Sequence, residues 1–169
     1  FDRKGAITRE RESNDPMRQW FMDHCNPNQF DGTLSEAMID ADIFIGVSAP
    51  NVLVEGDIKA MTSNAIVFAL SNPDPEIDPA IARRYAAVVA TGRSDQPNQI
   101  NNVLAFPGIF RGLLDSGIHK ISDEMLVAAA EAIANCVGNE QLNASYIIPS
   151  VFDSNVVKNV ALAVMSRQI

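Results

Sequence analysis

Apolar and polar residues alternate along this chain in blocks that are typical of parallel strands separated by helices. Three uninterrupted apolar runs have the length of single strands, and stretches with helix-capping residues lie between them. A strand that is apolar at consecutive positions is buried on both faces, as in a parallel sheet covered by helices. The predicted strands are 42–47, 65–70 and 87–91. We therefore expect an α/β fold with a parallel sheet and helices on both faces.

Capping residues mark where several helices begin. Asp15 precedes a proline at the first helical position, and Thr33 to Glu36 form a capping box. Asp78, which is also followed by a proline, opens another helix. The predicted helices are 15–24, 33–36, 55–61, 78–84, 122–137 and 154–168, and everything after Pro97 is expected to be helical. The sheet is therefore expected to be followed by C-terminal helices.

The first five residues resemble the end of a strand and its turn. Phe1 to Gly5 are not preceded by an initiator Met, and the body of such a strand is missing. The length of 169 residues suits one domain. We expect residues 1–169 to be a single domain truncated at its N-terminal side, inside a sheet, so that the first strand and a glycine-rich loop are missing.

Each predicted strand ends in a polar loop. These loops are 48–51, 71–75 and the longer segment from Gly92 to Asn102, which is rich in carboxamides. In a parallel sheet the three loops lie along one edge, where ligands bind outside the carboxyl ends of the strands. Carboxamides both donate and accept hydrogen bonds, so they suit a ligand of mixed polarity. The pattern predicts a nucleotide or small-acid site, although any one loop could simply form turns.

Charge and cysteine content exclude several classes of function. The net charge is −8 and the isoelectric point is about 4.6, which argues against a nucleic-acid partner. No apolar run has the length of a membrane span, and no signal peptide is recognisable. Cys25 and Cys136 lie far apart without a CxxC partner, so neither a disulfide framework nor a zinc site is expected. We expect a cytoplasmic protein with no membrane partner.

Five segments together resemble one known family. Residues 1–5, 45–50, 68–77 and 91–112 look like the NAD(P)-binding domain of malic enzymes of the short bacterial type, and 146–153 is similar to the segment before their last helix. The resemblance covers essentially the whole chain in the expected order. It implies a Rossmann-like fold and the oxidative decarboxylation of malate to pyruvate and carbon dioxide. It also implies NAD as cofactor, with NADP possible, and Mg or Mn in the intact enzyme.

The resemblance assigns four residues to the cofactor. Asn72 matches an asparagine beside the nicotinamide and its ribose, and Ser48 and Ala49 match a loop along the dinucleotide. Asp2 matches an acidic residue at the adenosine ribose, which favours NAD because a carboxylate repels a 2′-phosphate. Arg3 and Lys4 stand close enough to weaken that preference. Asp2 could equally form an Asp-x-x-Gly turn, and Asn72 could start a turn.

Asn102, together with Asn101, matches the amides that hold the substrate carboxylate in this family. Both could instead lie in a helix, with one of them exposed. Arg93 could also bind a carboxylate or pair with Asp95, and Arg111 could do so or pack on a partner. Neither arginine is assigned a catalytic role.

Several parts of the family's machinery have no match in this chain. No G-x-G-x-x-G is present, and the family's lysine base, tyrosine acid and carboxylate metal ligands lie upstream of the matching segment. The clustered acids Asp74, Glu76 and Asp78 are interpreted as turn formers and a helix cap. We therefore assign no catalytic residue and no metal ligand here, and expect the chain alone to be inactive.

Two other functions remain open. A malolactic enzyme has similar loops and converts malate to lactate while retaining its cofactor. A freestanding NAD-binding module without catalysis would also explain the loops. For the intact enzyme we expect malate and pyruvate as small-molecule ligands and a homo-oligomer, in particular a dimer.

Overall fold

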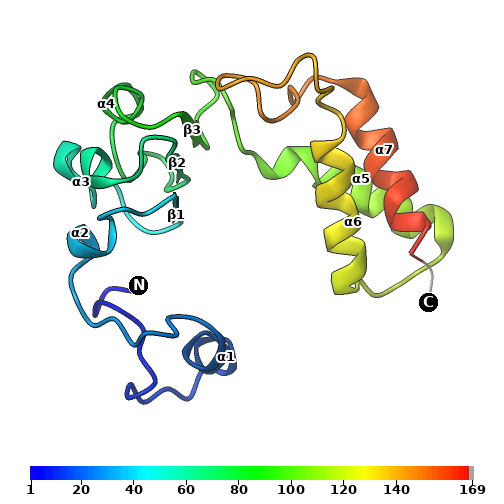
Figure 1. Cartoon of the computed structure of the whole chain (residues 1–169). Helices are drawn as coiled ribbons and strands as arrows, with labels where there is room; N and C mark the ends of the chain where they lie inside the picture. Colours follow the sequence, from blue (N-terminus) through cyan, green and yellow to red (C-terminus); the bar gives the residue numbers. More distant parts are fainter. Residues whose placement is uncertain (168–169) are drawn as a thin grey trace.

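The computed structural model describes residues 1–167, and residues 168–169 lie outside the described part of the chain. Three strands form one parallel sheet in the order β1 (Ile43–Gly46), β2 (Ile66–Ala69) and β3 (Val88–Thr91) (Figure 1). The strands pair in register, since Ile43 lies opposite Ile66 and Ile66 lies opposite Val88. The predicted α/β fold with a parallel sheet is confirmed, and each strand is shorter than predicted by one residue or two.

Four short helices precede or connect the strands. They are α1 (Pro16–His24), α2 (Leu34–Ala37), α3 (Glu55–Ala60) and α4 (Pro79–Ala82). The predicted caps form: the Asp15 carboxylate accepts from the Met17 amide, and the Asp78 carboxylate accepts from the Ala80 amide. The capping box between Thr33 and Glu36 is also present. Local sequence therefore determines where these helices begin.

The C-terminal part contains η1 (Asn102–Leu104), α5 (Phe106–Ser116), α6 (Asp123–Ala134) and α7 (Ser154–Met165). Continuous helix after Pro97 was a wrong prediction, because 135–153 is non-helical and Gly117 ends α5 in the left-handed conformation at φ 67°. Helix α6 ends three residues before its predicted limit. The predicted end of the last helix at 168 lies outside the described residues.

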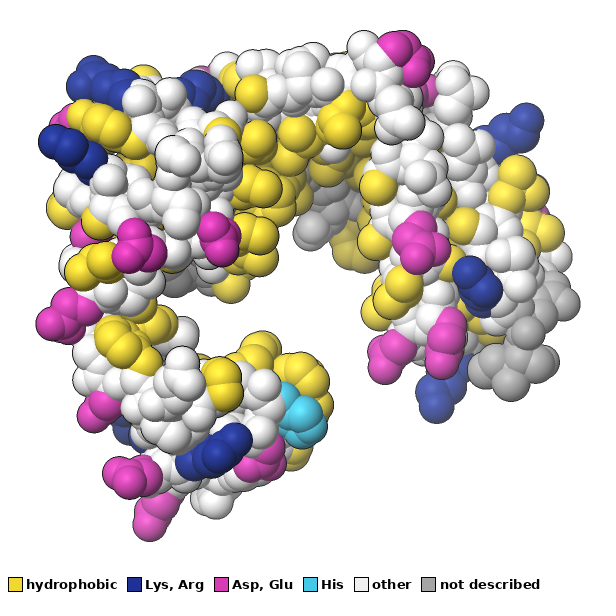
Figure 2. All heavy atoms as spheres, in the orientation of Figure 1, with side chains coloured by type: hydrophobic (Ala, Val, Ile, Leu, Met, Phe, Trp, Pro, Cys, Tyr) yellow, Lys and Arg dark blue, Asp and Glu magenta, His cyan; other side chains and the backbone are white. Residues whose placement is uncertain are grey.

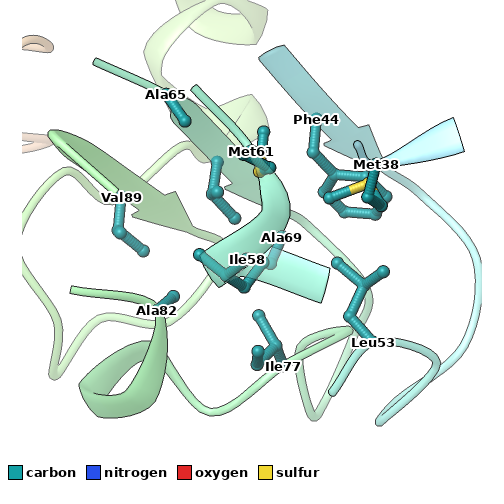
Figure 3. Packing of buried hydrophobic residues seen from close by; sticks show 11 residues of the cluster. Met38, Phe44, Leu53, Ile58, Met61, Ala65, Ala69, Ile77, Ala82 and Val89 are labelled. Atoms are coloured by element: carbon teal, nitrogen blue, oxygen red, sulfur yellow. The ribbon is translucent and has the colours of Figure 1, made fainter. Parts of the chain in front are cut away.

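Two hydrophobic clusters form the core. The first joins the sheet to the helices beside it (Figure 3), and its buried members are Met38, Phe44, Leu53, Ile58, Met61, Ala65, Val67, Ala69, Ile77, Ala82 and Val89. The second lies among α5, α6 and α7 and is centred on Met125, Val156, Val160 and Val164. Helices α5 and α7 approach so closely that a Cβ on Gly108 would lie 2.5 Å from the Val160 Cβ. Position 108 therefore requires glycine, because a side chain would have no room between the two helices.

One face of the sheet is covered and the other is open along β1. Phe44 is buried at 9% exposure, whereas its neighbours Ile43 and Ile45 are 55% and 63% exposed and Val47 is 78% exposed. Figure 2 shows hydrophobic side chains gathered along the side of the sheet that is turned toward α5–α7. Helices were expected on both faces of the sheet, and within residues 1–167 they cover one face and leave the other open along β1. No described helix is long and apolar enough to cross a membrane.

Candidate functional site

The loops after β2 and β3 form a cavity at the carboxyl edge of the sheet. Its volume is about 410 Å³, and it is lined by Ser71, Asn72, Pro73, Gly92, Arg93, Ser94 and Asp95. Parallel pairing of β2 with β3 brings these two loops together, since both strands end at the same edge. The cavity therefore lies where the sequence predicts a ligand.

Asn72 is an exposed side chain on the wall of this cavity. Its neighbour Ser71 is buried at 7% exposure, so the backbone of the loop is held while the amide of Asn72 remains accessible. Ser48 and Ala49, on the loop after β1, are also exposed. An accessible amide on a fixed loop is suited to hydrogen bonding with a polar ligand.

Glu76 holds the first two loops together. Its side chain is fully buried, and one carboxylate oxygen accepts from the Ser48 amide at 2.8 Å and from the Ser48 hydroxyl at 3.2 Å. The other oxygen accepts from the Ser71 amide at 3.0 Å. The prediction that Glu76 is a turn former was incomplete, because Glu76 lies in a turn but its carboxylate also bonds two loops. The signal available in the sequence was its position between two apolar residues, Pro75 and Ile77, which the structure buries.

Of the other two acids of that cluster, Asp78 is a helix cap as predicted. Asp78 caps α4, and exposed Asp74 lies 3.7 Å from Arg93. Only Glu76 faces inward, because the turn places its side chain beneath the loops.

Asn98 connects the sheet to the C-terminal region. It is buried at 6% exposure, and its amide nitrogen donates to the Val89 carbonyl at 3.0 Å and to the Ala144 carbonyl at 2.8 Å. Its side-chain oxygen accepts from the Ile147 amide at 2.9 Å. Its φ of 57° lies in the left-handed region, which asparagine tolerates better than most residues. Sequence reasoning missed this role, because every partner of the Asn98 side chain is at least nine residues away.

Both arginines considered as carboxylate binders have acidic partners. Arg93 donates to Asp95 through two bonds of 2.8 Å, and this pairing lowers the pKa of Asp95 to about 2. The hydrogen bond to Asp95 also raises the pKa of Arg93. Arg111 donates to Asp115, one helical turn away, at 2.7 Å. Arg93 nevertheless lines the cavity, whereas Arg111 lies on α5.

Asn101 and Asn102 lie at the start of η1, and both are exposed. The Asn101 side-chain oxygen caps η1 by accepting from the Val103 amide at 3.0 Å. Its amide nitrogen therefore remains available as a donor. The expectation that one of the pair is exposed understated their accessibility.

Asp2 forms the turn considered above and an ion cluster. Its backbone pairs with Gly5, and its carboxylate accepts from the Lys4 amide at 2.8 Å. Arg11 contacts both carboxylate oxygens at 2.9 and 2.7 Å, and Arg18 lies 3.2 Å away. The Arg11 hydrogen bonds and then the Lys4 amide hold the pKa of Asp2 below its usual value. The carboxylate that was expected to repel a 2′-phosphate therefore lies beside two arginines, which offset part of its charge.

Residues 1–167 contain no group of three or more His, Cys, Asp or Glu side chains that could hold a metal ion. Cys25 and Cys136 are free thiols. The donor set of the described residues therefore does not fit a Mg or Mn centre, and no metal-dependent step follows from it.

Comparison with known proteins adds an independent finding. Residues 82–169 match the family described as "Malic enzyme, NAD binding domain". The chain is 54% identical over 164 residues to an NAD-dependent malic enzyme of Geobacillus stearothermophilus, covering 97% of this chain and 34% of that protein. It is 47% identical to a bifunctional malic/malolactic enzyme of Bacillus subtilis, covering 96% of this chain and 40% of the relative.

A solved structure shows the same arrangement. The crystal structure of an NAD-dependent malic enzyme from Thermotoga maritima superposes with a TM-score of 0.88 at 43% identity, covering 97% of this chain and 43% of that one. The chain therefore spans between about a third and two fifths of the length of the curated relatives named above.

Proposed function

Because this chain belongs to the malic enzyme family, within its NAD-binding domain, we propose that it supplies the cofactor-binding loops of a whole malic enzyme that converts malate to pyruvate and carbon dioxide. The observation that carries this proposal is the cavity at the carboxyl edge of the sheet, which is walled by Asn72 and the Gly92–Asp95 segment. Parallel α/β sheets bind dinucleotides at this edge.

In this proposal Asn72 binds the nicotinamide half of NAD, and Ser48 and Ala49 contact the dinucleotide along the neighbouring loop. Asp2 accepts hydrogen bonds from the adenosine ribose. The accessible amide of Asn72 supports the first assignment, and the exposure of Ser48 and Ala49 supports the second. NAD supplies the hydride acceptor when it is bound, and this chain orients it.

Asn101 and Asn102 are proposed to donate to a malate carboxylate. The free amide nitrogen of Asn101 and the exposed side chain of Asn102 support this role. These residues bind and orient, and proton transfer is left to residues outside this chain.

NAD titration of the whole enzyme tests the cofactor assignment. Asn72→Ala removes a neutral hydrogen-bonding partner, so Kd for NAD should rise about tenfold, which corresponds to about 1.4 kcal/mol. Asn64→Ala is the matched control, because Asn64 is exposed just before the opposite, amino end of β2. Equal NAD affinity for both variants would contradict the assignment, and no NAD binding by the wild type would contradict the proposed function.

Product analysis separates the malic from the malolactic reaction. We propose the malic one, for which pyruvate accumulates with reduced cofactor. Lactate without net reduction would instead favour the malolactic alternative, to which the 47% identity with a bifunctional relative gives weight. The isolated 169-residue chain should form no pyruvate. NAD binding without either product in the whole protein would favour a non-catalytic module.

The proposed whole enzyme is a cytoplasmic homodimer. Two free cysteines suit a reducing compartment. Sedimentation analysis of the whole enzyme tests the dimer, and a monomeric mass at micromolar concentration would contradict it.

A further inference from the structure

We propose that Glu76 is a positioning residue for the bound dinucleotide, acting through the two loops that it ties together. This inference rests on the proposed function, because it assumes that these loops hold NAD. The Glu76 side chain is fully buried, so it does not contact the bound cofactor itself. Its effect must therefore pass through Ser48 and Ser71.

The carboxylate acts as a bridge with one oxygen for each loop. Oε1 accepts from the amide and hydroxyl of Ser48, and Oε2 accepts from the amide of Ser71. Ser48 is itself a proposed cofactor contact, and Ser71 directly precedes Asn72. A single buried group therefore sets the separation between two loops that follow neighbouring strands.

The backbone supports the same bridge. The Leu53 amide donates to the Glu76 carbonyl at 3.0 Å, and the Asn51 amide donates to the Pro75 carbonyl at 3.2 Å. These bonds hold the far end of the first loop on the turn that carries Glu76. The loop after β1 is consequently fixed to the loop after β2 at both of its ends.

Space for the carboxylate comes from Gly46, the last residue of β1. A Cβ at this position would lie 2.5 Å from the Glu76 carboxyl carbon and 2.6 Å from its Oε1. Any larger residue would displace the carboxylate from beneath the strand. The sequence thus carries a paired requirement, glycine at 46 and glutamate at 76.

Burying the Glu76 carboxylate costs free energy unless it keeps its hydrogen-bond donors. Within residues 1–167 no Lys or Arg forms an ion pair with Glu76, so backbone amides and one hydroxyl satisfy its charge. A buried carboxylate is tolerated only when it is hydrogen-bonded in this way. A neutral apolar residue would fill the same volume with less penalty, which indicates that the bridging geometry is what the site requires.

The test uses the whole enzyme with Glu76→Gln. Glutamine keeps the shape but turns one oxygen into an NH₂ group, which faces a backbone N–H and cannot accept from it. One loop is released, and KM and Kd for NAD should rise about tenfold, since a hydrogen bond to a charged group is worth more than a neutral one. At saturating NAD, kcat should stay within about threefold, because the reacting groups are untouched.

Two further variants complete the design. Glu131→Gln is the matched control, since Glu131 is exposed on α6, and its NAD constants should equal those of the wild type. Glu76→Asp keeps the charge but is shorter by one methylene, so an intermediate rise in KM for NAD is expected. It also supplies the test if the glutamine variant does not fold.

The split between KM and kcat distinguishes positioning from mere stability. A loss of folded protein lowers the apparent kcat and leaves KM for NAD unchanged. Wild-type NAD constants in folded Glu76→Gln and Glu76→Asp, or a loss confined to kcat, would overturn the proposal. Absence of NAD binding by the wild type would instead overturn the proposed function itself.

Discussion

Replacing Asn98 with alanine should loosen the connection between the sheet and the C-terminal region. Asn98 is the buried side chain that bonds to Val89 at the sheet and to Ala144 and Ile147 in the loop before α7. Alanine removes all three hydrogen bonds at once. It leaves two carbonyls and one amide without this partner in a region that water reaches poorly.

The magnitude follows from these contacts and from the backbone. Three hydrogen bonds at about 0.5–1.5 kcal/mol each contribute roughly 1.5–4.5 kcal/mol to the free energy of unfolding. The φ of 57° adds about 1 kcal/mol for alanine, because its Cβ crowds the carbonyl in the left-handed region. We expect a total loss of roughly 2.5–5.5 kcal/mol, which is a large share of the roughly 5–15 kcal/mol typical of a domain.

Asn51→Ala is a matched control for the backbone contribution. Asn51 has the same φ of 57° but is exposed, so its replacement should lower the free energy of unfolding by about 1 kcal/mol only. Asn98→Asp should be at least as harmful as alanine, since a carboxylate placed against two carbonyls cannot donate to them.

Urea unfolding of the whole enzyme measures the loss, and hydrogen exchange localises it. The Ile147 amide should exchange faster in Asn98→Ala, because its acceptor is gone, while amides within β2 keep their protection. The reasoning is refuted if Asn98→Ala loses no more stability than Asn51→Ala. It is also refuted if the Ile147 amide keeps its wild-type exchange rate.

Three further predictions concern the ligands and pH. Asn102→Ala should lower kcat/KM for malate by about one to two orders of magnitude, because a hydrogen bond to a charged carboxylate is lost, and Asn102→Asp should lower it further. Steady-state kinetics in malate measure this effect, and a loss of NAD affinity with unchanged malate constants would contradict the assignment. Asp2→Ala should weaken NAD binding and narrow the NAD over NADP preference in paired titrations, and an unchanged ratio would leave Asp2 as a turn residue. The lowered pKa of Asp2 means that its pairing with Arg11 stabilises the fold fully above the unfolded pKa of about 3.9 and is lost as the pH falls through the lower folded value. Asp2→Asn should therefore show a shallower loss of stability below about pH 4 than the wild type, and identical acid unfolding curves would argue against this contribution.

The short-range features of this fold were predictable because they depend on neighbouring residues. The helix caps involve hydrogen bonds over only two or three positions, so they can be predicted from the local sequence, as at Asp15, Asp78 and the capping box of Thr33. The three strands follow from uninterrupted apolar runs, and their shared edge follows from parallel pairing. The resemblance to malic enzymes rested on the loops at that edge, and the family match bears it out.

Only the tertiary structure decided which polar side chains turn inward. Glu76 meets Ser48 across 28 positions and Asn98 meets Ile147 across 49, and nothing in the adjoining residues specifies either partner. The pairing of Arg11 with Asp2 and the open face beside Ile45 likewise depend on how distant segments pack. The sequence distinguishes apolar from polar residues, but a buried carboxylate or amide is stable only where hydrogen-bond partners lie next to it. Which distant residues become those partners depends on how the whole chain packs.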